Sequence, residues 1–164
     1  MCGAQMQSRC MTETCAIHTA GLADVGQIMP VMATAFDPMF REAWTQSQVE
    51  SALLIPGTKL FVATRNDCPV GFALVRSLFE ECELLLIAVL PAMREQRIGS
   101  ALIQYTLAVA KVSSVLKLFL EVRITNGAIS FYHRHGFKVI GERPNYYRNK
   151  CGEPLNALTM TVDI

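Results

Sequence analysis

The chain has 164 residues with a net charge of +1, and 51% of its residues are hydrophobic against 18% charged. These values are typical of one globular domain with a sizeable core and exclude an intrinsically disordered protein. The near-neutral charge gives no case for nucleic acid as an electrostatic partner, and no apolar run approaches the roughly 20 residues that span a bilayer.

The first part of the chain predicts a tail, a strand and a helix. Residues 1–14 are polar and show no periodicity, which predicts a loose N-terminal tail. Residues 15–19 alternate weakly, as a strand does. Asp24, with Gln27 three residues later, is typical of a capping box that begins a helix, and Pro30 is expected to kink or shorten it. The expected inward positions are Ile28, Val31, Met32 and Phe36.

A second helix and a hairpin are expected next. The helix runs through Leu54 and is stopped by Pro56 and Gly57, and Trp44 ahead of it is expected to be a packing anchor. The alternative first residues of this helix are Thr45, Ser47 and Gln48. The two strands of the hairpin are expected at residues 59–64 and 70–78, and the turn between them at residues 66–69.

Residues 83–112 are the centre of the expected fold, in the order strand, loop and helix. Residues 84–90 form a continuous apolar run closed by Pro91, as in a strand covered on both faces. The loop over residues 94–100 opens a helix, and such a loop offers unpaired N–H groups and the positive end of the helix dipole. It therefore suits a phosphate or pyrophosphate, with plain connectivity as the alternative. The expected inward positions of the helix are Ile98, Leu102, Tyr105, Val109 and Val112.

The last part of the chain returns to strands. Residues 115–122 alternate, and either Thr125 or Asn126 can cap a short helix that ends near Gly136. That helix is expected to carry Ile129, Phe131 and Tyr132. Two final strands are expected at residues 137–140 and 155–162. The order β-α-α-β-β-β-α-β-α-β-β predicts an α/β fold with a mixed sheet flanked by helices.

Several side chains are candidates for chemistry. Glu121 lies near the end of an apolar strand, where a structural carboxylate is least expected, so it is a candidate general base. Its alternative is an edge charge or a salt bridge to Arg123. Tyr132 alone is typical of a core tyrosine with a satisfied hydroxyl, and Tyr146 with Tyr147 is open between hairpin packing and binding.

Cysteine and histidine spacing predicts no metal site. The six cysteines include no CxxC pair and no zinc-finger spacing. His133 and His135 are two residues apart on a helix and so lie on different faces. Cys68 and Cys82 have strand-like surroundings and are expected to be buried thiols. Free thiols and the lack of an apolar signal region predict an unexported, cytoplasmic protein.

A family resemblance covers roughly residues 15–164, which we expect to form one domain. The stretches that carry it are Ile87-Ala88-Val89-Leu90-Pro91, residues 94–100, Leu120-Glu121-Val122-Arg123, residues 126–132, His135-Gly136-Phe137, residues 143–147 and residues 157–160. With these motifs the chain resembles the GNAT family of acetyl-CoA-dependent N-acetyltransferases, and within it the bacterial ribosomal-protein-alanine (RimI-type) enzymes.

The resemblance implies a GNAT fold of about seven strands and four helices. It implies acetyl-CoA as cosubstrate, no metal, Glu121 as base and Tyr132 as the acid that protonates the coenzyme A thiolate. A break in strand pairing beside residues 87–89 would free a backbone N–H to polarise the thioester. The acceptor would be a protein N-terminus, the N-terminal alanine of a ribosomal protein, in a cleft formed with Tyr146 and Tyr147. The cofactor positions implied are Ile87, Ala88, Val89, Arg94, Glu95, Gln96, Arg97, Ile98, Gly99, Ser100 and Asn126.

Two departures and two rivals accompany this interpretation. The first loop glycine of the family is Arg97 here, whose guanidinium suits pairing with phosphate. Asn126 lies six residues before Tyr132, one fewer than in the best-known members, and Thr125 occupies the usual register. The rivals are a GNAT enzyme for a small amine or a lysine side chain, and a non-catalytic acyl-CoA-binding module. A monomer or weak dimer is expected, with neither nucleic acid nor membrane as partner.

Overall fold

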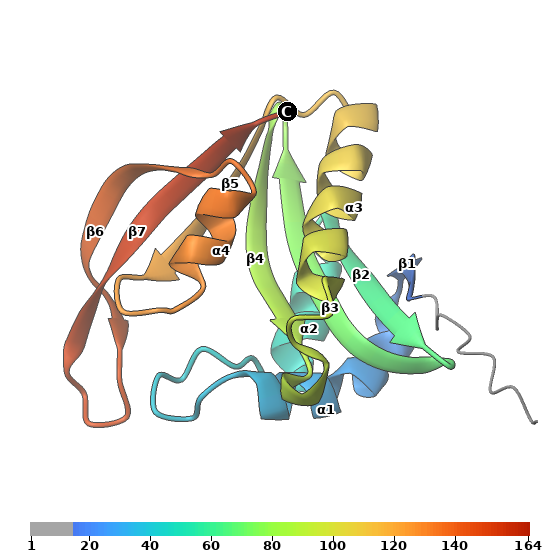
Figure 1. Cartoon of the computed structure of the whole chain (residues 1–164), viewed down its shortest axis with the longest axis horizontal. Helices are drawn as coiled ribbons and strands as arrows, with labels where there is room; N and C mark the ends of the chain where they lie inside the picture. Colours follow the sequence, from blue (N-terminus) through green and yellow to red (C-terminus); the bar gives the residue numbers. More distant parts are fainter. Residues whose placement is uncertain (1–14) are drawn as a thin grey trace, which may run out of the picture.

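The computed structural model describes residues 15–164, so the expected tail over residues 1–14 lies outside the described residues. One sheet of seven strands, in the order β1-β2-β3-β4-β5-β7-β6, is flanked by four α-helices (Figure 1). The elements in chain order are β1 (Ala16–Ala20), η1 (Leu22–Asp24), α1 (Val25–Ala35), α2 (Gln46–Leu53), β2 (Thr58–Arg65), β3 (Cys68–Leu78), β4 (Glu81–Val89), η2 (Pro91–Met93), α3 (Ile98–Val112), β5 (Lys117–Arg123), α4 (Ile129–Arg134), β6 (Lys138–Arg148) and β7 (Pro154–Asp163). The expected fold class, strand number and helix number are confirmed.

The sheet has two antiparallel parts joined by one parallel pair. β1 to β4 form an antiparallel meander, and β7 pairs antiparallel with both β5 and β6. β4 and β5 are parallel but pair only from Glu81↔Lys117 to Glu83↔Phe119. Beyond Glu83 the two strands part, which leaves the rest of β4 without a strand partner on its β5 side (Figure 1).

Two hydrophobic clusters fill the two faces of the sheet. Side chains of α1 and α2 pack on one face with Leu60, Phe72 and Leu74. Side chains of α3 and α4 pack on the other with Phe61 and Val75. Neighbouring residues of β2 and β3 thus alternate between the clusters, as the strand period of two requires. The long apolar run of β4 is explained because both of its faces are covered.

A β-bulge at Leu85 reverses the alternation in β4. The register with β3 shifts between Leu74↔Leu86 and Val75↔Leu84, so Leu85 has no partner of its own. Leu84 consequently belongs to the cluster under α3, whereas Leu86 belongs to the cluster under α1 and α2. An inserted residue bends the strand and re-aims its side chains. The bulge lies two residues beyond Glu83, where β4 and β5 part.

Local sequence chemistry accounts for most element boundaries. Thr45 caps α2 and its hydroxyl accepts from the Gln48 N–H, while the Gln48 side chain accepts from the Thr45 N–H. This is the capping box that selects Thr45 among the three expected starts. Asn66 and Asp67 both adopt positive φ in the tight turn between β2 and β3.

α1 begins at Val25 with Asp24 as its N-cap residue, so the expected start of the helix is confirmed, but the expected capping box is not formed. The Asp24 carboxylate accepts from the Gly21 N–H, while the Gln27 amide contacts the Asp24 side chain at 3.4 Å. Asp24 therefore stabilises the turn before the helix and does not form a capping box with Gln27. α1 continues through Pro30 to Ala35, so the helix does not end at Pro30.

Three further expectations were wrong. β6 extends through Arg148 and includes Tyr146 and Tyr147, because irregular pairing at residues 144–146 lets the strand resume. Cys82 is buried but Cys68 is exposed, since it begins β3 beside the turn. Val112 is 88% exposed because α3 buries Ile103, Thr106 and Ala110 in its later turns instead.

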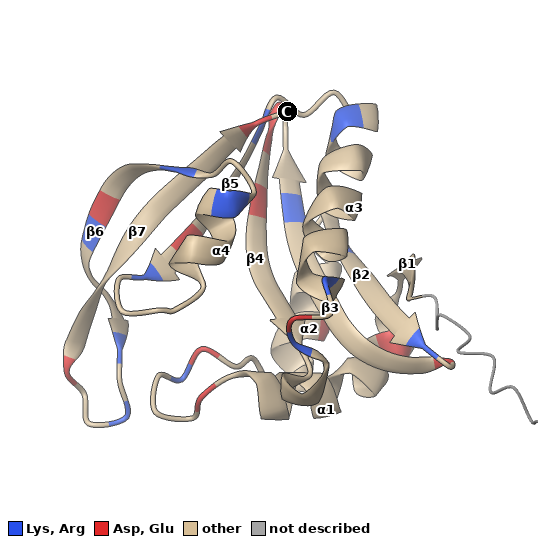
Figure 2. Ribbon diagram, in the orientation of Figure 1, with Lys and Arg blue, Asp and Glu red and all other residues tan. Residues whose placement is uncertain are grey.

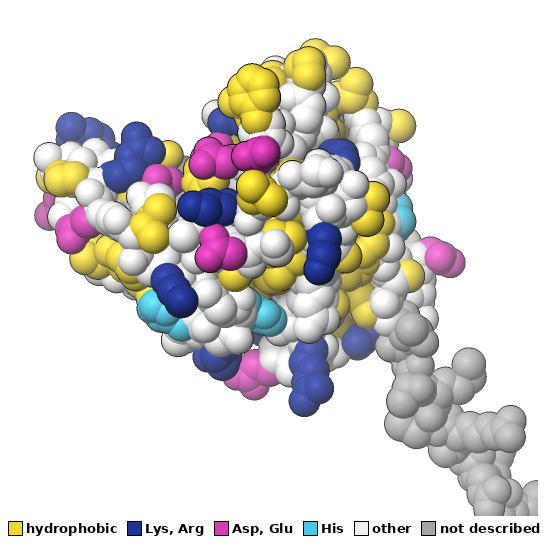
Figure 3. Space-filling model, turned by 90° about the horizontal axis from the view of Figure 1, so that it is seen from above, with side chains coloured by type: hydrophobic (Ala, Val, Ile, Leu, Met, Phe, Trp, Pro, Cys, Tyr) yellow, Lys and Arg dark blue, Asp and Glu magenta, His cyan; other side chains and the backbone are white. Residues whose placement is uncertain are grey.

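The surface is mixed in charge, and none of the helices over residues 15–164 has the length and apolar character to cross a membrane. Figure 3 shows acidic and basic side chains interspersed on the face seen from above, in keeping with the net charge of +1.

Candidate active site

The candidate site lies where β4 and β5 part. The edge of β4 over residues 84–89 keeps its pairing with β3, apart from Leu85, but has no pairing with β5. Backbone groups on this edge are available to an extended ligand, as on any exposed strand edge. The expected break in pairing beside residues 87–89 is therefore on the β5 side of the strand.

The N-terminus of α3 lies at the end of this edge. Arg97 is the N-cap residue, with φ of 62° and ψ of 10°, in the left-handed region that favours glycine. Ala101 is the first residue whose N–H bonds to the Arg97 carbonyl, so the N–H groups of Ile98, Gly99 and Ser100 have no partner within the helix. Together with the helix dipole they form a place for an anion.

Side chains on either side of this turn hold the loop. Arg94 donates to the carbonyl of Ala35 at 3.0 Å, and Arg65 donates to the Gln96 side chain at 2.6 Å. Arg94 and Gln96 therefore contact protein through their side chains, and the loop backbone and the Arg97 side chain remain for a ligand.

α4 is fastened to the first turn of α3. The Phe131 ring lies 3.3 Å from the position that a Cβ on Gly99 would occupy. His135 Nε2 lies 3.0 Å from Ser100 Oγ, and the His135 and Phe131 rings meet edge to face at 4.7 Å. Burial and the charge of Arg134 lower the pKa of His135 below its usual value. The sequence interpretation assigned no such role to His135.

Glu121 projects from β5 toward the face that carries α1 and α2. Its carboxylate accepts from the Thr159 hydroxyl at 2.9 and 3.0 Å and from Arg143 at 3.2 Å. The side chain is 9% exposed. These bonds fix its orientation and leave carboxylate lone pairs for an amine or a water, because an ionised carboxylate accepts about four bonds. The alternative pairing with Arg123 is not present.

Tyr132 is buried on α4, and its ring contacts Phe131 and Phe137. Burial, and then the negative charge of Glu42, raise the pKa of its hydroxyl far above the usual value. The hydroxyl is therefore protonated at neutral pH. Among residues 15–164 no hydrogen bond occupies it, so the expectation of a satisfied core hydroxyl does not hold.

Glu42 and Arg123 are site residues that the sequence interpretation missed. Glu42 lies in the loop between α1 and α2, and its carboxylate is 3.2 Å from the Arg123 guanidinium at the end of β5. Arg123 is 6% exposed, stacks 3.3 Å from the centre of the Phe40 ring and also donates to Thr125. Figure 2 shows charged residues both in this loop and at the end of β5. The carboxylate is thereby held near Tyr132.

Tyr147 and Tyr146 differ in their surroundings. The Tyr147 hydroxyl donates to the backbone carbonyl of Glu121 at 3.1 Å. Burial raises the pKa of Tyr147, and the proximity of Glu42, Tyr146, Glu121 and Tyr132 raises it further. Tyr146 is 42% exposed, packs edge-on against Tyr147 at 4.9 Å and lies beneath Arg143. Tyr147 thus lies close to Glu121 and Tyr132, whereas Tyr146 lies at the exposed edge of the site.

Neither Thr125 nor Asn126 caps α4, because its N-cap residue is Ala128 and no side chain caps it, so that expectation was wrong. Asn126 instead stabilises the turn before the helix. The Asn126 side-chain carbonyl accepts from the Ala128 N–H at 2.9 Å, while Thr125 accepts from Arg123. Only the amide nitrogen of the Asn126 side chain is left to donate to a ligand. Within the described part of the chain, no group of three or more His, Cys, Asp or Glu side chains could hold a metal ion.

The site therefore combines an anion-binding turn, an open strand edge, an oriented carboxylate and a protonated phenol. A carboxylate can accept a proton from an amine, and a phenol can donate one to a leaving group. This pairing, beside a place for a phosphorylated ligand, suits transfer of an acyl group to an amine.

Comparison with known proteins gives independent findings. Residues 29–137 match the acetyltransferase (GNAT) family. The [ribosomal protein bS18]-alanine N-acetyltransferase of Haemophilus influenzae is 34% identical over 95 residues, which are 58% of this chain and 65% of that protein. That of Escherichia coli K12 is 33% identical over 105 residues, 63% of this chain and 70% of that protein. The matched part thus spans about two thirds of these relatives.

Solved structures agree in fold. The ribosomal-protein-S18-alanine N-acetyltransferase of Escherichia coli superposes with a TM-score of 0.82 and 26% identity, covering 92% of this chain and 94% of that one. Ard1 from Thermoplasma volcanium superposes with a TM-score of 0.75 and 26% identity, covering 92% and 97%. The family resemblance noted in the motifs of residues 87–160 is confirmed.

Proposed function

The chain belongs to the GNAT family of acetyltransferases, and on this premise we propose that it transfers acetyl from acetyl-CoA to the N-terminal α-amine of a protein. The acceptor we propose is the N-terminal alanine of a ribosomal protein, the substrate in the names of the Haemophilus and Escherichia relatives. The proposed compartment is the cytoplasm.

The residues present fit acetyl-CoA. The unbonded N–H groups of Ile98, Gly99 and Ser100 suit its pyrophosphate, and the guanidinium of Arg97 can pair with phosphate oxygens. The unpaired edge of β4 over residues 87–89 suits an extended pantetheine arm. The bound cosubstrate supplies an activated acetyl group as a thioester.

The observation that carries the proposal is that Glu121 and Tyr132 both lie close to Tyr147, on the side of the sheet where β4 and β5 part. Glu121 accepts the proton of the attacking amine, directly or through a water, from an orientation fixed by Thr159 and Arg143. Tyr132 holds a proton at its hydroxyl for the leaving sulfur, because a phenol is protonated at neutral pH and burial raises its pKa further. A pure binding module needs neither group.

The pKa of the acceptor favours an α-amine over a lysine. An α-amino group titrates near 7.7–8.0 and a lysine near 10.4, a gap of about 2.5 units. At neutral pH, deprotonating the lysine therefore costs about 3.4 kcal/mol more. One carboxylate is a sufficient base for the first amine and a strained one for the second. Tyr147 and Tyr146 lie where they can flank the first residues of a peptide.

The test is a pair of peptides incubated with acetyl-CoA and followed by mass spectrometry. One peptide has a free N-terminal alanine, and the other has a blocked N-terminus and an internal lysine. We expect acetylation of the first peptide only. Preferential acetylation of the blocked peptide would overturn the assignment, and reaction of a small amine alone would favour a small-molecule enzyme.

A further inference from the structure

His135 lies in a polar contact that joins α4 to the first turn of α3. Its Nε2 is 3.0 Å from the hydroxyl oxygen of Ser100, and its ring meets that of Phe131 edge to face at 4.7 Å. Ser100 also carries one of the N–H groups that have no partner within the helix. The contact therefore connects a titratable side chain directly to residues 97–100, which we call the anion-binding turn.

A phosphate in the anion-binding turn would lie close to the His135 ring. A phosphate oxygen bonded to the Ser100 N–H lies about 2.9 Å from that nitrogen. Ser100 Oγ belongs to the same residue, and the imidazole is one further hydrogen bond away. The negative charge and the ring are therefore about 5–8 Å apart, within the Debye length of about 8 Å at physiological salt.

The neighbours of His135 on its own helix oppose a positive charge on the ring. Burial lowers the pKa of His135, and the positive charge of Arg134 lowers it further. His133, on the same helix, is bonded through Nδ1 to the backbone carbonyl of Phe137 at 3.0 Å and does not contact Ser100. In the free chain the ring is therefore harder to protonate than an exposed histidine.

The elements packed against His135 supply no negative charge. The group that faces the ring from α3 is the neutral Ser100, the first turn of that helix contains no acidic residue, and its N-cap residue Arg97 is positive. On the β7 side, the apolar Val162 lies next to Gly136. Among residues 15–164, no Asp or Glu side chain forms an ion pair with His135. A bound anion would thus be the missing partner of a protonated ring.

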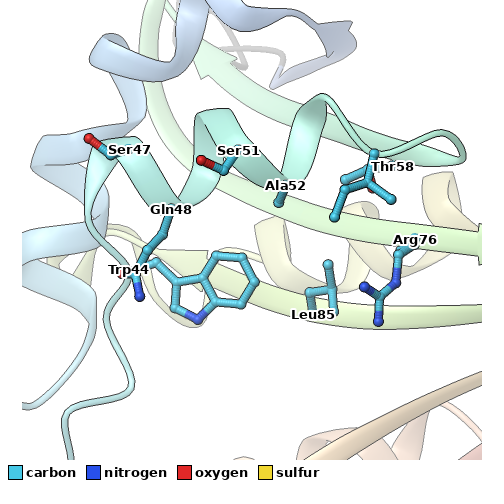
Figure 4. Close-up of a pocket in the computed structure, with 9 residues that line it drawn as sticks. Trp44, Ser47, Gln48, Ser51, Ala52, Thr58, Arg76 and Leu85 are labelled. Carbon is cyan, nitrogen blue, oxygen red and sulfur yellow. The ribbon is translucent and has the colours of Figure 1, made fainter.

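The open pocket under α2 is less suited to phosphate. It lies between α2 and the sheet, on the face away from α3 (Figure 4). Arg76 lines it, but its guanidinium is paired with Glu83 at 2.8 Å, so the charge is balanced. Arg97, by contrast, forms no ion pair within the part of the chain that the structure describes. The phosphate groups of acetyl-CoA are therefore expected at the turn beside His135.

We propose that His135 is a positioning residue of the acetyl-CoA site, which holds Ser100 in the anion-binding turn and takes up a proton from the solvent when the pyrophosphate binds. The inference rests on the proposed use of acetyl-CoA. The proton goes to the ring nitrogen that has none in the neutral imidazole, so both nitrogens then carry a hydrogen. Nε2 donates to Ser100 Oγ, and the hydrogen of the Ser100 hydroxyl is free to donate to a phosphate oxygen.

The consequence is tighter binding of the cosubstrate at lower pH. The bound anion favours the charged ring, so the pKa of His135 is higher in the complex than in the free chain. Affinity therefore increases as the pH falls through the pKa of the complex, and it levels off below the pKa of the free chain. We expect the Kd to be about fivefold lower at about pH 5.5 than at about pH 7.5.

The test is calorimetric titration of the whole chain with 3′-dephospho-coenzyme A. The pyrophosphate of this ligand keeps its charge over the pH range used, whereas the monoester of coenzyme A has a pKa of about 6 and would titrate itself. Titrations at about pH 6 in two buffers of different ionisation enthalpy give the number of protons that accompany binding. We expect an uptake of about 0.4 proton per bound ligand in the wild type.

Three variants address the contact. His135→Gln keeps a partner for Ser100 but does not titrate, so it should bind without proton uptake and with the same Kd at both pH values. His133→Gln is the matched control on the same helix and should keep the uptake and the pH dependence of the wild type. Ser100→Ala keeps the N–H groups of the turn but loses the hydroxyl, so it should bind about fivefold more weakly at about pH 6.

The outcomes separate this inference from the proposed function. Binding to the wild type without proton uptake, or equal uptake in His135→Gln and the wild type, would overturn the role of His135. Wild-type affinity in Ser100→Ala would overturn it equally, because Ser100 would then not be the link to the phosphate. If the ligand does not bind at any pH, the proposed acetyl-CoA site itself fails.

Discussion

The carboxylate of Glu42 and the guanidinium of Arg123 lie 3.2 Å apart, although 81 residues separate them in the chain. The pair joins the loop between α1 and α2 to the end of β5, across the parting of the sheet. Their side chains are only 13% and 7% exposed. Because Glu42 also raises the pKa values of Tyr132 and Tyr147, this one contact fastens the loop and contributes to the electrostatics of the site.

Arg123→Met should lower the free energy of unfolding by about 3 kcal/mol, since it leaves the Glu42 carboxylate buried without its partner. Arg76→Met is the matched control, because the Arg76 and Glu83 side chains are 41% and 22% exposed. Loss of that pair should cost less than about 1 kcal/mol. Urea unfolding followed by circular dichroism measures both. Equal losses would mean that the buried pair contributes no more than a surface pair.

Tyr132→Phe should reduce kcat about 10²-fold, the low end for general acid catalysis, with acetyl-CoA affinity nearly unchanged. The substitution keeps the contacts of the ring with Phe131 and Phe137 and removes only the proton donor. Tyr105→Phe is the control, because Tyr105 lies on α3 and packs against Phe61. Wild-type turnover in Tyr132→Phe would leave Tyr132 as a core residue.

Local patterns predicted most of the elements. The apolar run of residues 84–90, the start of α2 near Thr45 and the turn at Asn66 and Asp67 each depend on residues close in the sequence. Features that depend on register were not predicted. The bulge at Leu85 lies inside a uniform apolar run, where no residue type marks it. The irregular pairing near Pro144 concealed the continuation of β6.

The candidate site was predicted in part, because only some of its residues stand out in a local sequence pattern. Glu121 and Tyr132 stand out within short motifs, and the structure brings both to one place with Tyr147. Glu42 lies in a loop where a carboxylate is ordinarily solvated, and only the fold brings it to Arg123. Phe40 and Trp44 on either side of Glu42 are the one available sign, since aromatic residues in a loop indicate that it packs.

Gly99→Val should weaken acetyl-CoA binding, because its Cβ would lie 3.3 Å from the Phe131 ring, so that the ring or the anion-binding turn must shift by a few tenths of an ångström. Calorimetric titration should show an increase in Kd of about tenfold or more, the equivalent of 1.4 kcal/mol. Gly141→Val is the control, because nothing lies within 4 Å of a Cβ at Gly141. Unchanged affinity in Gly99→Val would mean that this turn only connects the strand to the helix.

His135 should make stability depend on pH. Its pKa is lowered in the folded chain by burial and by Arg134, so the unfolded chain takes up the proton first as the pH falls. The contribution of neutral His135 is therefore present above the unfolded pKa of about 6.5 and is lost as the pH falls below it.

The variant His135→Gln keeps a partner for Ser100 but does not titrate. Between about pH 7.5 and pH 5.5 it should lose less stability in urea unfolding than the wild type. His18→Gln, at an exposed position of β1, should follow the wild-type slope. The same slope in His135→Gln and wild type would show that His135 is not coupled to folding.

Glu121→Gln should slow acetylation of an N-terminal alanine by roughly 10²-fold, and by more at low pH than at high pH. An α-amine with a pKa of about 7.7–8.0 is mostly protonated below neutral pH, so the reaction there requires a base. Near pH 9 most of the amine is already neutral, and the deficit of the variant should shrink. Glu142→Gln, at an exposed position of β6, should keep the wild-type profile.

Because Glu121 also receives hydrogen bonds from Thr159 and Arg143, a purely structural role predicts a deficit that is the same at every pH. That constant deficit would remove Glu121 as the base and leave it as the residue that orients β7 and the β6–β7 hairpin beside the site.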